Sequence, residues 1–316
     1  MESARIHQAM SSLSPPTMPQ AQARKKPVVG RFAPSPSGPL HAGSLIAAIG
    51  SYLSARSQSG LWLLRMEDVD GDRVRPGAAD TILRQLEALG LDWDGPICWQ
   101  SQRHDYYQQT LDHLIKEGDA YPCACTRQEI RQHGGNYPGT CRHGLAAGRT
   151  ARSWRLRVPE QFPVWKDRFH GLQNTPPEQG DPVLLRADNY FAYLLACVVD
   201  DGAQGVSEVI RGGDLRTFTG VQRYLQSLLH LPRTEYGHLP LLCNADGSKL
   251  SKSSQSPAWT GSPGQGWETT LGLLGWDTPA ELHGASAEQW RNWALAEARG
   301  KTPFWHPPAT SVTLPL

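Results

Sequence analysis

The chain has 316 residues, of which 39% are hydrophobic and 19% charged, and its formal net charge is +1. This length fits one large or two ordinary domains with enough apolar residues for a core, and any basic surface for nucleic acid must be local. No apolar run approaches the ~20 residues that span a bilayer, and six cysteines without a regular framework indicate a reducing compartment. We therefore expect a cytoplasmic protein that does not contact a membrane.

The first 44 residues fall into two parts. Residues 1–27 are rich in Ser, Pro, Gln and Ala and predict a disordered leader. Residues 28–44, VVGRFAPSPSGPLHAGS, predict a strand, a turn and a helix start, because an apolar run with helical spacing follows. A helix N-terminus offers free N–H groups for phosphate, and His41 sits where it can touch phosphate or adenine. Taken alone, such a Pro-rich loop is more often an ordinary turn.

The segment LWLLRMEDVDGDRV predicts a buried strand with charged residues at its carboxyl end. Because ligands of open α/β sheets bind beyond the carboxyl ends of strands, Glu67 or Asp68 could pair there with an ammonium group. The alternative is a turn stabilised by Asp, which we expect for Asp70 and Asp72. Residues 76–95 and 101–118 then predict two amphipathic helices.

Cysteine spacing points to a metal site. Cys123 and Cys125 are one residue apart, and Cys141 follows in a Gly-rich turn, so three thiolates could hold a tetrahedral structural zinc ion. On chemistry alone, the ordinary fourth ligand would be His133 or His143. The alternative is three free buried thiols. The other cysteines stand in apolar surroundings and are expected in the core: Cys98, Cys197 and Cys243.

Residues 152–181 are rich in Arg, Trp and Pro and predict part of a small domain inserted between two halves of the main sheet. Arg155 and Arg157 are available there for phosphates, although a solvated strand face fits equally well. Residues 183–215 return to strand and helix, with Asp200 and Asp201 capping a turn and Asp214 starting the next helix.

The loop NADGSKLSKSSQS is polar and carries Lys249 and Lys252, which predicts either a mobile cationic flap or an ordinary solvated loop. The 63 residues after Ser253 predict two short helices, in WETTLGLLGW and AEQWRNWALAEA, and a Pro-rich tail that packs loosely.

The pair of motifs, HAGS at 41–44 and KLSKS at 249–253, resembles the two nucleotide signatures of class I aminoacyl-tRNA synthetases. The sequence RFAPSPSGPLH resembles the first signature of the glutamyl and glutaminyl branch of that family. The resemblance implies an α/β fold: a Rossmann-like parallel-sheet catalytic domain, an inserted small zinc-bearing α+β domain and a short helical C-terminal segment. The expected boundaries are 1–27 for the leader, 28–110 and 183–254 for the catalytic halves, 111–182 for the insertion and 255–316 for the C-terminal segment.

The same resemblance implies the residues of the site. ATP would be bound by His41, Gly43, Ser44 and Lys252, with His41, Lys249 and Lys252 as catalytic residues. Ser44 replaces the usual second His of the first signature, so its own role stays open. Glu67 would hold the amino group of glutamate, and buried Arg31 and Arg211 would hold its carboxylates by bidentate forks rather than pair with Glu67 or Asp214. The remaining glutamate contacts would be Phe32, Ala33, Pro34, Ser35 and Tyr193.

For the metal, the family pattern Cys-x-Cys…Tyr-x-x-x-Cys points to Tyr137 as the fourth ligand of one structural Zn²⁺ per chain. A phenolate ligand is unusual, because the pKa of a free tyrosine is about 10 and would have to be lowered.

The reaction implied by the resemblance joins L-glutamate to ATP, with Mg²⁺, to form glutamyl adenylate and pyrophosphate. Because 63 residues cannot hold an anticodon-reading domain, the chain resembles a branch that activates glutamate without tRNA and esterifies it to queuosine in the anticodon loop of tRNA(Asp). We expect a monomer. The alternatives are a truncated glutamyl-tRNA synthetase charging tRNA(Glu), a small-molecule nucleotidyltransferase and a non-catalytic RNA-binding paralogue.

Overall fold

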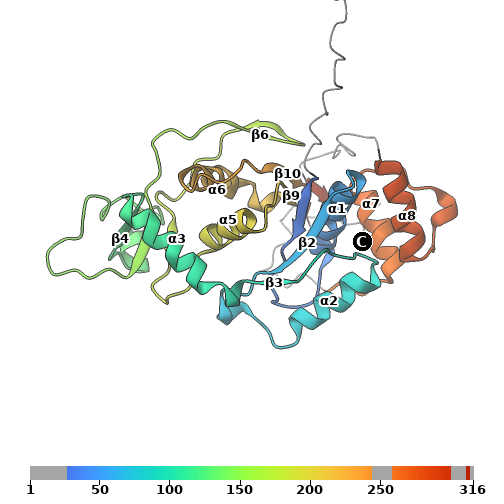
Figure 1. Ribbon diagram of the computed structural model, residues 1–316, viewed down its shortest axis with the longest axis horizontal. Coiled ribbons are helices and arrows are strands. Elements are labelled where there is room, and N and C mark those ends of the chain that lie inside the picture. The colour runs from blue at the N-terminus through green and yellow to red at the C-terminus, as the bar shows by residue number, and fades with distance from the viewer. Residues whose placement is uncertain (1–26, 244–257, 300–310, 314–316) are drawn as a thin grey trace, which may run out of the picture.

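The computed structural model describes residues 27–243, 258–299 and 311–313. Its centre is a parallel sheet in which Val29 pairs with Leu61 and Arg65 with Cys98 (Figure 1). These strands are β1 (Val29–Phe32), β2 (Leu61–Met66) and β3 (Cys98–Trp99), in the order β1-β2-β3.

A second group of strands lies on the other side of β1. The N–H of Ser207 donates to the carbonyl of Val29 at 2.9 Å, which sets the start of β9 beside β1. This sheet has the order β7-β6-β10-β9, with β9–β10 and β10–β6 parallel and β6–β7 antiparallel. Its strands are β6 (Trp165–Asp167), β7 (Gly171–Gln173), β9 (Glu208–Gly212) and β10 (Glu235–Leu239). The parallel pairings confirm the predicted α/β fold.

Helix α1 (Ala42–Ser57) is buried along most of its length because it lies between the sheet and the C-terminal helices (Figure 1). Those helices are α7 (Pro263–Leu273) and α8 (Ala287–Ala298), which match the two predicted near the C-terminus. Trp267 and Trp290 are fully buried in this core, and a buried side chain of that kind contributes roughly 2–3 kcal/mol. On the neighbouring side, α2 (Ala78–Ala88) ends before Gly90, whose φ of 69° suits the residue after a helix.

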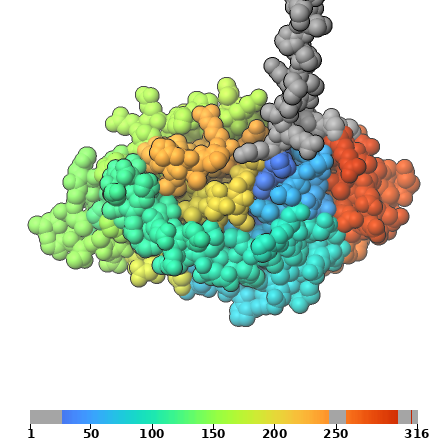
Figure 2. Space-filling model, viewed as in Figure 1, coloured from blue at the N-terminus to red at the C-terminus, as the bar shows by residue number. Residues whose placement is uncertain are grey.

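In Figure 2, the green middle part of the chain lies at the opposite end of the molecule from the red C-terminal helices. Much of it belongs to a second core of buried residues, separate from the core of Trp267 and Trp290. It is built around an antiparallel sheet with the order β4-β5-β8, whose strands are β4 (Ala120–Cys123), β5 (Ser153–Leu156) and β8 (Val183–Leu185). Helices of this part are α3 (His104–Lys116), α4 (Arg127–Gln132), α5 (Tyr193–Ala203) and α6 (Arg216–Leu228). Tyr107, Leu111 and Leu225 are fully buried there. Whether residues 111–182 form a domain of their own stays a prediction, and β6 within that range pairs with β10.

Three local predictions were wrong. Asp200 and Asp201 do not cap a turn; they lie inside α5 and are buried, because arginines reach them from neighbouring elements. Asp214 does not start a helix, since it sits in a 3₁₀ turn (Gly213–Leu215) that precedes α6. In the tail, β12 (Ser311–Thr313) pairs in parallel with β11 (Leu241–Cys243) rather than packing loosely.

Within the described ranges, further 3₁₀ turns lie at Gly71–Arg73, Gln100–Gln102 and Ala280–Leu282. Among the described helices, none combines the length and the apolar character needed to cross a bilayer.

Candidate functional site

The loops that leave β1 and β2 meet at the carboxyl ends of these strands. The N–H of Glu67 donates to the carbonyl of Pro34 at 2.9 Å, which fixes the loop of residues 33–40 beside Glu67. Ala33, Pro34 and Ser35 are partly exposed there and can offer backbone groups to a ligand. Phe32 is different, because its ring is buried and stacks on Trp62 at 6.2 Å. Any contact of Phe32 with a ligand would therefore use its backbone.

Arg31 and Arg65 share one buried carboxylate. Arg31 Nε donates to Asp201 Oδ1 at 3.2 Å, and Arg65 Nη1 donates to the same oxygen at 2.8 Å. Burial opposes ionisation of Asp201, but the two guanidinium groups outweigh it and lower the pKa of this carboxyl. Arg65 also lies 3.5 Å from Glu67. Arg65 thus has three acidic neighbours, because Asp200 also lies 4.0 Å from it. Arg31 pairs with Asp201 rather than with Glu67 and uses only its Nε to do so.

Arg211 has a different environment, because its side-chain partners are neutral. It is 4% exposed, and its Nη1 donates to Tyr193 Oη at 3.2 Å. In the described part of the chain, no carboxylate forms an ion pair with it, so the expected alternative of a pair with Asp214 is not seen. A buried guanidinium with neutral partners is costly unless an anion joins it. Arg211 is therefore suited to receive a carboxylate.

Tyr193 connects the two groups of arginines. Burial raises the pKa of its hydroxyl, while the positive charges of Arg211 and Arg31 oppose this shift. The structure thus brings together residues from β1, the end of β2, α5 and β9. This arrangement can hold a small molecule with two carboxylates and one ammonium group.

Two buried residues of this neighbourhood were missed in the sequence. His238 Nε2 lies 3.1 Å from Arg211 Nε, and His238 Nδ1 lies 2.5 Å from Asp167 Oδ2. Both side chains have no exposed surface. The sequence does contain a sign of both residues. Asp167 stands in VWKDRF and His238 in YGHLPLL, and a polar side chain inside a buried strand is uncommon unless it has a partner.

Acidification from pH 7 to pH 5 is expected to destabilise the protein through His238. Burial, together with the nearby Arg211, lowers the pKa of this imidazole to about 4 although its hydrogen bond to Asp167 opposes the shift. The unfolded chain takes up the proton near pH 6.5 and the folded chain does not, so stability present above pH 6.5 is lost as the pH falls toward 4. Linkage puts the loss at pH 5 at about 2 kcal/mol. Urea unfolding midpoints at both pH values measure this loss of stability. The His238→Gln variant should lose less stability between pH 7 and pH 5 than the unchanged protein. Equal losses in the two proteins would contradict the assignment to His238.

His41 is placed at the start of α1. It is the N-cap residue, and its Nδ1 accepts the N–H of Ser44 at 3.3 Å. A Cβ at position 43 would lie 3.1 Å from the imidazole, so Gly43 lets the ring fold back over the helix start. The first turn of α1 therefore presents backbone N–H groups beside an imidazole, as an anion site requires. The predicted strand, turn and helix start is confirmed.

Lys249 and Lys252 lie outside the described residues. The chain before them is described to Cys243 at the end of β11, and the chain after them resumes at residue 258. The N–H of Trp259 donates to the carbonyl of Leu40 at 2.9 Å. The described chain on that side therefore lies directly beside His41.

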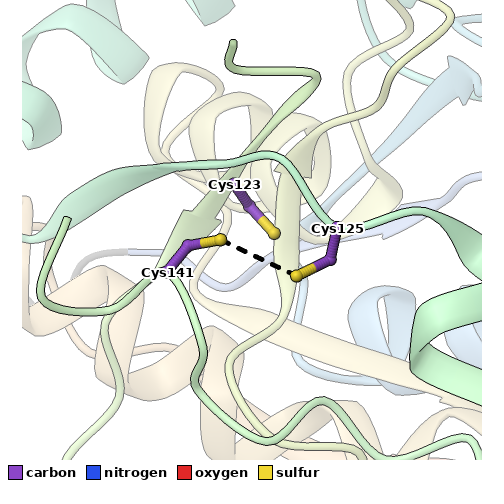
Figure 3. A group of neighbouring side chains, drawn as sticks. All are labelled: Cys123, Cys125 and Cys141. Atoms are coloured by element: carbon purple, nitrogen blue, oxygen red, sulfur yellow. Dashed lines mark hydrogen bonds between the residues drawn. The ribbon is translucent and has the colours of Figure 1, made fainter. Parts of the chain in front are cut away.

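Three cysteines converge between β4 and the Gly-rich segment that follows α4, as Figure 3 shows. Their Sγ atoms all lie within 4.8 Å of one another, and those of Cys125 and Cys141 are 3.7 Å apart. Tetrahedral zinc with Zn–S bonds of about 2.3 Å requires sulfur atoms about 3.8 Å apart. Arg155 Nε lies 3.3 Å from Cys123 Sγ. Burial opposes ionisation of Cys123, but the N–H of Cys125 and this guanidinium outweigh it and lower its pKa.

Tyr137 reaches the same cluster. Its Oη accepts the N–H of Cys141 at 2.9 Å and its side chain is buried with the three cysteines. Burial raises the pKa of Tyr137, so only a bound cation would make it a phenolate. His133 and His143 are exposed and do not belong to the described cluster. The donor set thus fits a zinc ion with three sulfur ligands and room for Tyr137.

Arg155 is not available for phosphates. It is 6% exposed, its guanidinium lies over the ring of Tyr137 at 3.8 Å, and its Nη1 donates to the carbonyl of Asp181. Arg157 likewise donates to the carbonyls of Gly118 and Arg142. Both side chains therefore stabilise the region around the cysteines. Arg155 is buried and must satisfy its donors within the protein, whereas Arg157 is only partly exposed.

Comparisons with known proteins agree on one family. The family model described as tRNA synthetases class I (E and Q), catalytic domain, matches residues 27–270. A glutamyl-Q tRNA(Asp) synthetase of Thiobacillus denitrificans is 51% identical over 278 residues, covering 84% of this chain and 91% of that protein. Another of the same name, from Chromobacterium violaceum, is 48% identical over 300 residues and covers 91% and 97%. A crystal structure of a glutamate tRNA ligase from Elizabethkingia meningosepticum in complex with its amino acid has a TM-score of 0.74 at 25% identity, covering 92% and 67%.

Proposed function

The chain belongs to the class I tRNA synthetases of the glutamate and glutamine type and, within them, to the glutamyl-Q tRNA(Asp) synthetases; from this premise we propose how its residues act. The enzyme activates L-glutamate with ATP to glutamyl adenylate, without tRNA, and transfers the glutamyl group to queuosine in the anticodon loop of tRNA(Asp). The observation that carries the proposal is the buried guanidinium of Arg211, which has neutral side-chain partners and donates to Tyr193 Oη. Glutamate supplies the missing anion.

Glutamate would be held at both ends. Arg211 and Arg31 would bind its carboxylates, with Tyr193 donating its hydroxyl, and Glu67 would pair with the ammonium group. Ala33, Pro34 and Ser35 would offer backbone groups, and Phe32 would support this loop from the core. Such a site disfavours glutamine, because an amide would leave the buried guanidinium of Arg211 without an anion.

ATP would lie at the start of α1, with a phosphate on the N–H group of Gly43. Ser44 and His41 would lie beside it, and the N–H of Ser44 would keep the imidazole of His41 in place. A carboxylate oxygen of glutamate attacks the α-phosphorus and pyrophosphate leaves; the nucleophile is already ionised, so no general base is needed. Lys249 and Lys252 would neutralise the charge that builds on the phosphates, and Mg²⁺ would accompany them. Catalysis then consists mainly of positioning and electrostatic stabilisation.

The remaining proposals concern the setting of the site. One structural Zn²⁺ per chain would be held by Cys123, Cys125, Cys141 and Tyr137, and its role would be to fix the loops around it. Residues 28–110 and 183–254 would form the catalytic domain, 111–182 the insertion and 255–316 the C-terminal segment, after a leader of residues 1–27. The enzyme would act as a monomer in the cytoplasm, where ATP and tRNA are present.

The test of the function is transfer of labelled glutamate to purified tRNA(Asp) with and without queuosine. We expect labelling of the queuosine-containing tRNA alone, and no labelling of tRNA(Glu). Glutamate-dependent ATP–pyrophosphate exchange without tRNA should accompany it, and Lys252→Ala should abolish that exchange. Labelling of tRNA(Glu) would instead identify a truncated glutamyl-tRNA synthetase, and equal labelling of both forms of tRNA(Asp) would end the queuosine assignment.

A further inference from the structure

A continuous chain of hydrogen bonds runs from a buried carboxylate to the guanidinium of Arg211. Asp167 ends β6 and His238 lies on β10, two residues beyond Tyr236, which is opposite Asp167 in the parallel pairing. His238 Nδ1 is 2.5 Å from Asp167 Oδ2, and its Nε2 is 3.1 Å from Arg211 Nε. The imidazole thus stands between the carboxylate and the guanidinium.

The partners determine where the proton on His238 lies. A guanidinium has only donors, so His238 Nε2 must accept from Arg211 and carries no proton. His238 Nδ1 then carries the proton and donates it to Asp167. The other oxygen of Asp167 accepts the N–H groups of Phe169 at 2.9 Å and His170 at 3.1 Å, which fixes the carboxylate in its own turn. Asp167 therefore sets the tautomer of His238.

The imidazole is also held in place by aromatic neighbours. The ring of Tyr236 is parallel to it, with 6.3 Å between the ring centroids, and Trp165 packs against it edge-on at 5.8 Å. The same Tyr236 ring lies 5.2 Å from the guanidinium carbon of Arg211. Neither the imidazole nor the guanidinium can turn without displacing a buried aromatic side chain.

These contacts use one side of the guanidinium. Arg211 Nε donates to His238, and Nη2 donates to Thr219 Oγ1 at 2.8 Å and Gln222 Oε1 at 2.6 Å. Nη1 points instead to the hydroxyl of Tyr193. Of the two terminal nitrogens, Nη1 is the one left for an incoming carboxylate, and Tyr193 can donate to that carboxylate as well.

We propose that Asp167 and His238 are positioning residues that fix which edge of Arg211 faces the substrate carboxylate. The inference rests on the proposed function, because it takes Arg211 as a glutamate-binding group. A carboxylate in direct contact with Arg211 would orient it too, but would also neutralise it and compete with the substrate. A neutral imidazole between the two keeps Arg211 oriented and leaves its charge to attract glutamate.

Two substitutions of the same residue separate the two contacts. In His238→Asn, the amide nitrogen takes the place of Nδ1 and can keep the bond to Asp167, while the contact to Arg211 is lost. In His238→Gln, the longer amide can place its oxygen near Arg211 Nε, while the bond to Asp167 is lost. Ser51→Ala serves as a control, because it also removes a buried hydrogen bond, the one that Trp62 Nε1 donates at 3.0 Å.

The measurements are KM for glutamate, KM for ATP and kcat in ATP–pyrophosphate exchange, with Tm for each variant. We expect His238→Asn to raise KM for glutamate by about tenfold or more, as loss of a hydrogen bond to a charged group does, with KM for ATP unchanged. His238→Gln should restore most of the affinity for glutamate, and Ser51→Ala should lower Tm without changing either KM. Calorimetric titration of each variant with glutamate, without ATP, checks the same order of glutamate affinities.

The proposal is overturned if His238→Asn binds glutamate as the unchanged enzyme does, or if KM for glutamate and ATP rise together in step with the loss of Tm. Arg211→Lys separates this result from failure of the proposed function. If the unchanged enzyme shows no glutamate-dependent exchange, or Arg211→Lys leaves KM for glutamate unaltered, the proposed function itself is at fault. If Arg211→Lys raises KM for glutamate and the His238 variants leave it unchanged, only the positioning role is wrong.

Discussion

Arg211→Lys is expected to lower kcat/KM for glutamate activation by about a hundredfold or more, with KM for ATP little changed. Arg211 makes hydrogen bonds through Nε and both terminal nitrogens while it offers an edge to the substrate. An ammonium group has three donors on one atom and cannot hold these partners and a carboxylate at once. The bond from Nη1 to the substrate and one of the bonds that orient the group would be lost. At roughly 1.5 kcal/mol each, these two amount to a factor of about a hundred.

The measurement is steady-state ATP–pyrophosphate exchange over a range of glutamate concentrations. Arg223→Lys is the matched control. Arg223 lies on α6 and is half-buried, and its Nη1 donates to the carbonyl of Thr234. Both variants should keep a folded far-UV spectrum. Near-normal glutamate activation by Arg211→Lys would show that its carboxylate partner is not the substrate.

Cys125→Ser is expected to remove the metal and loosen the region around β4 and β5. We expect the unchanged protein to purify with one zinc ion per chain. Cys125→Ser should lower the affinity for zinc by at least about a hundredfold, because loss of a direct ligand costs more than loss of a residue that only supports a ligand. The cysteines hold β4 and the segment of Cys141 together, and this small core contains few other apolar residues. Its folding should therefore depend on the ion.

Metal content by mass spectrometry and cleavage by limited proteolysis test this expectation. Cys98→Ser is the control, because Cys98 is half-buried on β3 and stands apart from the cluster. Tyr137→Phe tests the fourth ligand: zinc should remain bound but exchange faster with a chelator. A protein that carries no zinc after growth with added zinc would contradict the metal assignment, and unaltered exchange in Tyr137→Phe would remove Tyr137 from the ligand set.

The sequence by itself determined the local helices and strands and the type of reaction. Apolar periodicity predicted the strand, turn and helix start at residues 28–44 and the helices near the C-terminus, because this signal depends on neighbours within a few residues. The spacing of three cysteines likewise predicted a cluster, since they are close in the chain. The motifs HAGS and KLSKS pointed to the family that the comparisons then established.

Only the tertiary structure decided which charges meet. Arg31 and Asp201 are 170 residues apart, and Asp167 and His238 are 71 apart, so no local pattern could join them. Asp200 and Asp201 looked like turn residues because two adjacent acids usually stay in water, yet arginines from other elements stabilise them inside α5. Arg155 was expected on a surface and instead braces Tyr137 and Cys123. Pairings of this kind follow from the order of strands in the sheet, which long-range packing sets and local periodicity does not encode.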